Sequence, residues 1–209
     1  MDISHVMKEN KWIIHFQQPQ PGFCKAIIAS KLLPGVTITN NFTYFSFYAN
    51  HVCSLTEKLK KTRGKLQYID GVRLAKYIGQ QLFHLEEAHY TFSWLDINNI
   101  MIIDDSRFLY LGIDHLFSLN SNKHIQITTP FSKKNKFISP ELLSIKSLPA
   151  YIDYRTPYYS LGYIISYCLV DYDDKKLCQA LLPIYSTKLY WFILRCTREN
   201  PHQRSLLFI

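Results

Sequence analysis

The stretch HYTFSWLDINNIMII, residues 89 to 103, places polar side chains directly before an apolar run. Asp96 and Asn99 fall on what we predict to be a loop, and the run IMII that follows has the composition of a buried strand. Loops held by a rigid scaffold often carry catalytic or binding groups. The chemical question is whether these two residues take part in a reaction or only shape the loop.

Other residue types that do chemistry are scattered along the chain. The sequence contains five cysteines, Cys24, Cys53, Cys168, Cys178 and Cys196. No two of them form a C-x-x-C pair, which indicates neither a disulfide framework nor a zinc site. His84 and His89 are five residues apart, on different faces of a helix, and there is no Glu/His zinc motif. We therefore expect a reducing, intracellular compartment and no metal site of this kind.

Length and composition exclude further classes of protein. The chain has 209 residues, 47% of them hydrophobic, enough for one large domain or two small lobes around a core. The start, MDISHVMKENKW, is too charged for a signal peptide, and the apolar run near 158–170 is too short and too polar to span a bilayer. We expect a soluble protein with no membrane span.

The net charge of +8 is concentrated in two basic runs, EKLKKTRGK at 57–65 and SKKNK at 132–136. A basic protein attracts nucleic acid, anionic membranes or acidic partners, although most charge runs are solvated faces. The first run supplies the candidate contacts for an acidic or nucleic-acid surface: Lys58, Lys60, Lys61, Arg63 and Lys65.

The N-terminal part and the middle of the chain have different patterns. Residues 12–50 alternate short apolar runs with Pro and Gly, which indicates strands and turns. SLTEKLKK predicts a short charged helix, and DGVRLAKYIGQQLFHLEE predicts a long one with Asp70 as N-cap. The apolar face of the long helix recurs every three or four residues, at Val72, Ala75, Ile78, Leu82 and Leu85.

Beyond the loop, NIMIID and FLYLGI predict a hairpin, because DDSR between them favours a turn. Residues 115–138 lack a sustained period and predict a long loop. PYYSLGYIISYCLV is apolar nearly all round, which is typical of a helix buried on every side. LCQALLPIY and TKLYWFILRCTR predict further helices. The expected fold class is α+β, with two lobes.

Several landmarks between residues 66 and 204 resemble the C-terminal lobe of protein kinases in order and spacing. In that family a long helix leads into the loop H-R-D-L-K-P-E-N, then a hairpin, D-F-G, an activation segment, A-P-E, a buried helix and a late Arg. Aligned without a gap over residues 85–103, the loop Asn falls on Asn99. LGIDHLF is similar to the strand that enters D-F-G, with Asp114 in place of the Asp and His115 in place of the Phe.

The resemblance continues toward the C-terminus. ISPEL is similar to A-P-E and supplies Glu141, and NPHQR ends in Arg204, which resembles the Arg that pairs with that Glu. YYSLGYIISY places Gly162 at the Gly of the buried helix, although Pro157 stands where the family has Asp. The resemblance implies a buried Glu141–Arg204 ion pair, with the helix at 158–170 as the central post of the lobe.

The parts that hold the nucleotide depart from the kinase pattern. Phosphoryl transfer in that family needs a glycine-rich cradle for the phosphates and a Lys on a strand, paired with a helix Glu. Gly22 and Gly35 are far apart, and each adjoins a Pro. Lys25 and Lys31, in FCKAIIASKLL, are the candidates for the Lys. Only about twenty residues separate Lys31 from the expected hinge near Asn50, which leaves little room for the helix.

The catalytic base also departs from the pattern. In the gapless alignment H-R-D falls on Phe92, Ser93 and Trp94, and an indole can donate a hydrogen bond but cannot take a proton from a hydroxyl. Asp96 takes the place of the loop Lys, where a carboxylate would repel the transferred phosphate. We favour this alignment because it keeps the length of the loop.

Two alternatives remain open. A two-residue deletion would make Asp96 the base, which predicts an atypical Ser/Thr protein kinase using ATP, with Asn99 and Asp114 binding Mg²⁺. The other alternative is a basic adaptor that binds nucleic acid or an acidic surface.

The sequence thus favours a pseudokinase with a reduced N-terminal lobe at 1–50, mostly strands and turns, and a helical domain at 51–209 similar to a kinase C-lobe. We expect no catalytic residue, no cofactor, and a role in binding another protein. Its short, Tyr-, Phe-, Ile- and Asn-rich chain resembles the kinase-like proteins of large DNA viruses, which implies the host cytoplasm or the virion. The residues expected to be structural are Trp94, Glu141, Gly162 and Arg204.

Overall fold

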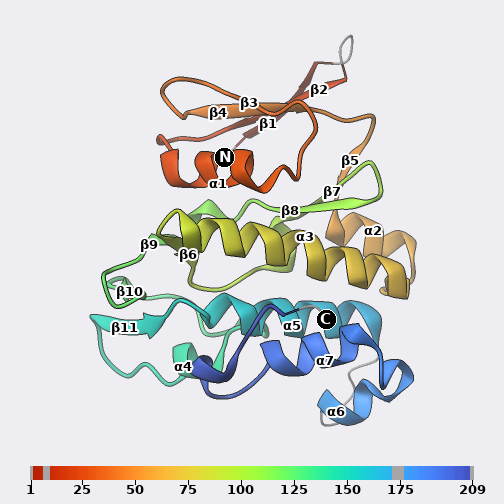
Figure 1. Ribbon diagram of the computed structural model, residues 1–209, viewed down its shortest axis with the longest axis vertical. Coiled ribbons are helices and arrows are strands. Elements are labelled where there is room, and N and C mark those ends of the chain that lie inside the picture. The colour runs from red at the N-terminus through yellow and green to blue at the C-terminus, as the bar shows by residue number, and fades with distance from the viewer. Residues whose placement is uncertain (1, 7–9, 171–176, 208–209) are drawn as a thin grey trace.

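The computed structural model describes residues 2–6, 10–170 and 177–207. It is a mixed α+β fold with several small sheets, which confirms the predicted class. Figure 1 shows its layers: an N-terminal sheet, a short helix beneath it, a long central helix beside a hairpin, and the C-terminal helices. No helix in the described part of the chain is both long and apolar enough to cross a bilayer.

The central helix α3, Tyr68–Glu87, has the apolar face predicted from its periodicity. Four of the five predicted positions are buried, and Val72 is half-buried. The N-cap is Gln67 rather than Asp70, because the helix begins a turn earlier; Asp70 lies in the first turn and accepts a hydrogen bond from Arg73 Nη1 at 3.2 Å. The short helix α2, Leu55–Lys61, is present as predicted and begins with a capping box.

The N-terminal sheet has four antiparallel strands in the order β1-β2-β4-β3. They are β1, Asp2–Val6; β2, Lys11–His15; β3, Thr37–Ile38; and β4, Tyr44–Tyr48. Ile14 pairs with Phe45, and Trp12 pairs with Phe47. Ile14, Phe45 and Phe47 are buried, so this face of the sheet belongs to the core.

Helix α1, Pro21–Ser30, shows that our prediction of strands and turns throughout 12–50 was wrong for this segment. Ile27 and Ile28 are β-branched and favour strands in isolation. A Pro in the first turn is compatible with a helix, and Phe23 and Ile27, four residues apart, are both buried. Packing against α3 therefore overrides local propensity, and α1 forms the layer between the sheet and α3 (Figure 1).

The predicted hairpin is present as β7, Ile100–Ile103, and β8, Arg107–Tyr110. Strand β5, Val52–Ser54, pairs with the other edge of β7, giving a sheet of order β5-β7-β8. Helix α3 packs against β8, so the hairpin is anchored to the central helix.

Residues 115–138 are not the continuous loop that we predicted. They contain β9, Leu116–Ser118, and β10, His124–Ile127. Strand β9 pairs with β6, Tyr90–Phe92, and β10 pairs with β11, Ala150–Asp153. Both strands are short and pair with segments distant in sequence, so no local period reveals them.

The C-terminal helices agree with the sequence except at one point. Helix α5, Thr156–Leu169, is buried on almost every side, and α7, Lys188–Cys196, packs against it. LCQALLPIY forms two separate turns, α6, Leu177–Ala180, and η4, Leu182–Ile184, because a Pro in the second position of η4 cannot continue the helix. The short elements α4, Pro140–Leu143, and η5, Pro201–Gln203, complete the fold.

Gly162 allows the close approach of α5 and α7. A Cβ built on it would lie 2.8 Å from Cys196 Cβ and 2.8 Å from Thr197 Cγ2. We predict that Gly162→Ala lowers the free energy of unfolding by about 1–3 kcal/mol through overpacking. Gly79→Ala, inside α3 where a Cβ meets nothing within 4 Å, should raise it by about 0.5–1 kcal/mol. Urea unfolding of both variants tests this, and two changes of the same sign would contradict it.

Candidate functional site

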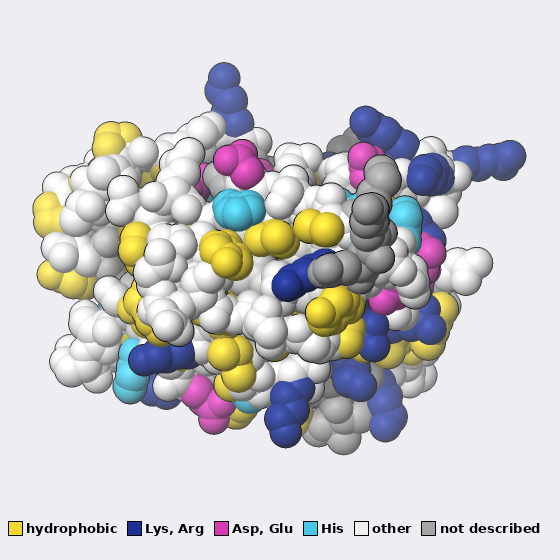
Figure 2. All heavy atoms as spheres, turned by 90° about the horizontal axis from the view of Figure 1, so that it is seen from above, with side chains coloured by type: hydrophobic (Ala, Val, Ile, Leu, Met, Phe, Trp, Pro, Cys, Tyr) yellow, Lys and Arg dark blue, Asp and Glu magenta, His cyan; other side chains and the backbone are white. Residues whose placement is uncertain are grey.

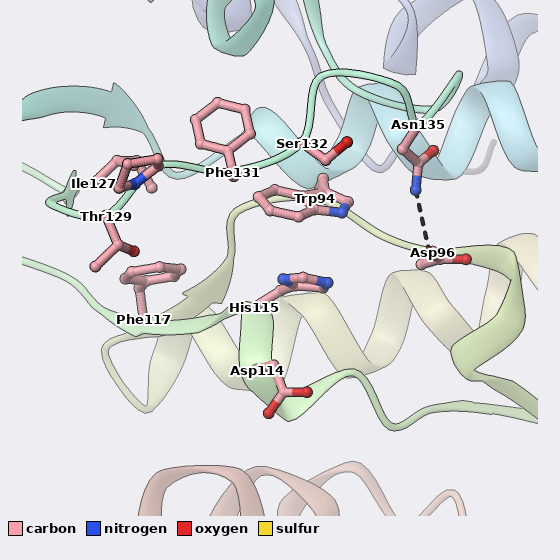
Figure 3. A pocket seen from close by; sticks show the side chains of 11 residues that line it. Trp94, Asp96, Asp114, His115, Phe117, Ile127, Thr129, Phe131, Ser132 and Asn135 are labelled. Carbon is pink, nitrogen blue, oxygen red and sulfur yellow. Dashed lines mark hydrogen bonds between the residues drawn. The ribbon is translucent and has the colours of Figure 1, made fainter. Parts of the chain in front are cut away.

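The largest hollow near the predicted site residues has a volume of ≈ 530 Å³ and is shown in Figure 3. We call it the aromatic pocket. Its lining comes from three segments: the loop after β6, the turn η3, Ile113–His115, with β9, and the chain from Ile127 to Asn135. The lining residues are Trp94, Asp96, Asp114, His115, Phe117, Ile127, Thr129, Pro130, Phe131, Ser132 and Asn135.

The pairing of β6 with β9 brings the first two segments together. Phe92 lies opposite Leu116, so the chain that leaves β6 runs beside the turn that enters β9. The Ser93 N–H extends the ladder by donating to the His115 carbonyl at 2.8 Å. Two residues far apart in sequence, Trp94 and His115, thereby become neighbours.

Trp94 lies between two other rings. Its ring centroid is 4.0 Å from that of His115, with 36° between the planes, and 5.3 Å from that of Phe131, with 37° between the planes. Figure 3 shows His115 on one side of the indole and Phe131 on the other. The three rings connect the three segments of the pocket, and the indole of Trp94 can donate a hydrogen bond but cannot accept a proton.

The carboxylate of Asp96, the alternative base, accepts hydrogen bonds that hold the loop in place. Its Oδ1 accepts hydrogen bonds from the Asn98 backbone N–H and side-chain Nδ2, both at 2.9 Å, and caps the short turn η2, Ile97–Asn99. Its Oδ2 accepts from Asn135 Nδ2 at 3.2 Å. Both carboxylate oxygens therefore have protein partners, which is typical of a structural carboxylate.

Asn99 does not line the aromatic pocket. Its backbone carbonyl accepts from the Leu111 N–H at 2.9 Å, which closes the base of the hairpin. The nearby Tyr110 hydroxyl is buried, and burial raises the pKa of this phenol well above its ordinary value, an effect that the Asp96 backbone and the Asn99 side chain partly oppose by hydrogen bonding. Tyr110 was not among the residues singled out from sequence, because its run is simply apolar.

Asp114 is exposed and faces the N-terminal part of the chain. Its carboxylate points away from the Trp94 stack, as Figure 3 shows. On that side it lines a second hollow of only ≈ 100 Å³, which it shares with Gln17, Gln18 and Gln20. Among the described residues, no lysine lines this hollow.

The two candidate lysines are placed differently from the prediction. Lys25 lies on the exposed side of α1 and not on a strand, and Lys31 is the left-handed C-cap residue of that helix, with φ 52°. Both are exposed and neither lines a hollow that contains Asp114. The cause is helix α1, which the sequence pattern did not reveal. Their assignment as the strand Lys of a kinase required an extended segment, and both residues instead belong to the helix or to its C-cap.

The described residues contain no group of three or more His, Cys, Asp or Glu side chains arranged to hold a metal ion. Asp96 and Asp114 share the aromatic pocket, but Asp96 is hydrogen-bonded and Asp114 points to the opposite side. Two separated carboxylates would bind a divalent cation weakly.

The ion pair between Glu141 and Arg204 is present, as predicted. Arg204 Nη1 and Nη2 donate to the two carboxylate oxygens of Glu141 at 2.5 and 2.8 Å, a bidentate arrangement. The Arg204 side chain is 0% exposed, and it also donates to the carbonyls of Arg198 and Glu199. The pair therefore joins α4 to the C-terminal segment.

Comparisons with known proteins gave no match, either to a family model or to a curated sequence. The geometry of the chain itself therefore carries the functional argument.

We predict that Glu141→Gln lowers the free energy of unfolding by about 3–5 kcal/mol, because it leaves the buried guanidinium of Arg204 without a counter-charge. The matched control is Asp105→Asn, which breaks the exposed ion pair with Lys58 (3.0 Å) and should cost less than about 1 kcal/mol. Asn tolerates the positive φ of 53° at this position. Equal losses in denaturant unfolding would contradict the prediction.

The stack on Trp94 should make stability depend on pH. Burial lowers the pKa of His115, and the charges of Asp114 and Asp96 oppose this shift less strongly. An unfolded His titrates near pH 6.5, so the unfolded chain binds more protons there than the folded one. This part of the stability is present above about pH 6.5 and is lost as the pH falls through the lower, folded-state pKa.

The substitution His115→Phe keeps an aromatic ring in the stack and removes the group that can take up a proton. We predict that the native protein loses more free energy of unfolding than this variant between pH 7.5 and pH 5.5, measured in urea. Identical pH profiles would show that His115 is not the group responsible.

Proposed function

We propose that this protein has a kinase-like fold, lacks phosphoryl-transfer activity and binds another protein. The observation that carries the proposal is the Phe131–Trp94–His115 stack, with centroid distances of 5.3 and 4.0 Å. In the alignment with kinases Trp94 stands at the catalytic Asp, and it has no atom that can accept a proton from a substrate hydroxyl.

Support for the kinase-like arrangement comes from the order of the elements. A long helix, α3, precedes a loop and a hairpin, then the turn with Asp114, a strand-bearing segment, and the short helix α4 with Glu141. Helix α5 follows, and Arg204 closes the series by pairing with Glu141. The two-lobe division at residue 50 is part of the proposal.

The surroundings of the other kinase-like positions favour a non-catalytic role. Asp96 has hydrogen-bond partners on both carboxylate oxygens, so it is poorly placed to act as the base of an atypical kinase. The hollow between Asp114 and the N-terminal part measures ≈ 100 Å³, whereas small-molecule sites usually occupy about 300–1,000 Å³. Glutamines in that hollow offer a triphosphate no positive charge.

A binding role is supported by exposed apolar surface. The aromatic pocket is lined by the half-buried rings of Phe117 and Phe131. At the C-terminal end, η4 and α7 with the turn between them expose Leu182, Tyr185 and Trp191. Apolar groups grouped on a surface often mark protein interfaces.

The test is a thermal-shift measurement with ATP and Mg²⁺. A nucleotide at a hundred times its Kd would stabilise the protein by about 2.7 kcal/mol, which a melting curve detects. We expect no change in melting temperature. A rise that Asp114→Ala abolishes and Asp105→Asn preserves would overturn the proposal and favour the atypical kinase that uses Asp96, Asn99 and Asp114.

A further inference from the structure

The two basic runs of the sequence meet at one hollow. Segment 57–65 and segment 132–136 lie side by side around a pocket of ≈ 300 Å³, which we call the basic pocket. It is lined by Leu59, Lys60, Gly64, Ile97, Lys136 and Tyr167, among others. Seen from above the N-terminal sheet, Lys and Arg side chains gather on the side of the molecule that carries α2 (Figure 2).

Some cations of these runs are occupied by the fold itself. Lys58 pairs with Asp105 at 3.0 Å, and Lys65 donates to the carbonyls of Tyr167 and Val170. Lys133 Nζ donates to the carbonyls of Leu143 and Ile145 at 2.7 and 2.6 Å. These three residues hold segments together, so Lys58 and Lys65 leave the set of surface contacts predicted from sequence.

The remaining cations are available to a partner. Lys60, Lys61, Arg63 and Lys134 are exposed and form no ion pair within the part of the chain that the structure describes, although the Glu57 carboxylate interacts electrostatically with Lys60 and Lys61 at longer range. Lys136 is also exposed and is held over the Tyr167 ring, with its Nζ 3.3 Å from the ring centroid. In the described chain, no Asp or Glu lines the basic pocket. Two of these five cations, Lys60 and Lys136, line the hollow itself, and the other three are exposed residues of the same two basic runs.

The floor of the hollow has a different character. Leu59 and Ile97 contribute apolar side chains, and Tyr167 contributes its ring. A ligand that fits must therefore carry an apolar group for the floor and negative charges for the rim.

We infer that the basic pocket binds an acidic peptide segment of a partner protein, with one apolar side chain in the hollow and neighbouring Asp or Glu side chains against Lys60, Arg63 and Lys136. This inference rests on the proposed protein-binding function and specifies the chemistry of the partner. A surface of one charge sign also accelerates encounter with an oppositely charged segment.

The geometry favours a peptide over single-stranded nucleic acid. Nucleic-acid grooves combine a basic track with aromatic faces on which bases stack. Among the described residues that line the basic pocket, the aromatic ring is that of Tyr167, and Lys136 covers one of its faces, so a base has less of this ring on which to stack. The available charges surround a compact hollow.

The experiment measures fluorescence anisotropy of a labelled peptide of Glu and Asp with one central Leu. We expect salt-sensitive binding that weakens about tenfold in the double variant Lys60→Glu/Arg63→Glu, because it reverses the charge of one lining residue and of the exposed residue that precedes the lining Gly64. Replacing the central Leu of the peptide with Ser should weaken binding as well. Lys136→Met keeps the stem over Tyr167 and removes only the charge, so it should also weaken binding.

The matched control is Lys25→Glu/Lys76→Glu, which makes the same change in net charge on α1 and α3, at exposed positions outside the basic pocket. Equal weakening in this control, or no binding to the native protein, would overturn the inference. Tighter binding of a labelled oligothymidylate than of the peptide at the same salt concentration would replace it with the nucleic-acid adaptor. Melting curves establish whether each variant is folded. If Lys136→Met does not fold, Lys60→Glu/Arg63→Glu still tests the inference, because both of its residues are exposed.

The two proposals fail separately. Absence of peptide binding together with an unchanged melting temperature in ATP and Mg²⁺ removes only the acidic-peptide inference. Stabilisation by ATP and Mg²⁺ together with charge-dependent peptide binding removes only the non-catalytic assignment.

Discussion

The side chain of Gln81 forms two hydrogen bonds with the backbone of Tyr110, and the candidate site depends on them. Gln81 Nε2 donates to the Tyr110 carbonyl at 2.8 Å, and the Tyr110 N–H donates to Gln81 Oε1 at 2.9 Å. Both residues are buried, and β8 is the edge strand of its sheet, so these backbone groups would otherwise lack partners in a dry environment. The side-chain amide of Gln81 thus satisfies the outward-facing N–H and C=O groups of Tyr110 and fixes the hairpin to α3.

The effect of this contact extends from the hairpin to the loop. The Tyr110 ring packs edge-on against Phe92, with centroids 4.6 Å apart, and its hydroxyl accepts from the Asp96 N–H at 3.2 Å. Gly112 leaves room for that hydroxyl, because a Cβ there would lie 2.2 Å from it. The loop with Trp94 and Asp96 is therefore held from the core side by a buried phenol.

The extent to which sequence predicted the structure follows from the range of the interactions involved. Helices α3 and α5 and the β7–β8 hairpin were predictable because their signals, periodicity and turn residues, are local. The Glu141–Arg204 pair was expected from the resemblance of ISPEL and NPHQR to kinase motifs. Helix α1 was missed because its β-branched residues favour a strand until α3 and the sheet pack on it. The Phe131–Trp94–His115 stack depends on the pairing of two three-residue strands, which leaves no signal in either segment alone.

The same loop and the same segment separate the aromatic pocket from the basic pocket. Asp96 lines the aromatic pocket, and its neighbour Ile97 lines the basic one. Likewise Asn135 lines the aromatic pocket, and Lys136 lines the basic one. The hydrogen bond from Asn135 Nδ2 to Asp96 Oδ2, at 3.2 Å, joins the two segments that contribute to both pockets. Asp96 therefore has a structural role. Both oxygens of its carboxylate accept hydrogen bonds, and these contacts account for an acidic residue at this position without a role in proton transfer. A partner that binds at the proposed basic pocket would contact the same two segments that line the aromatic pocket, and this hydrogen bond would support both surfaces.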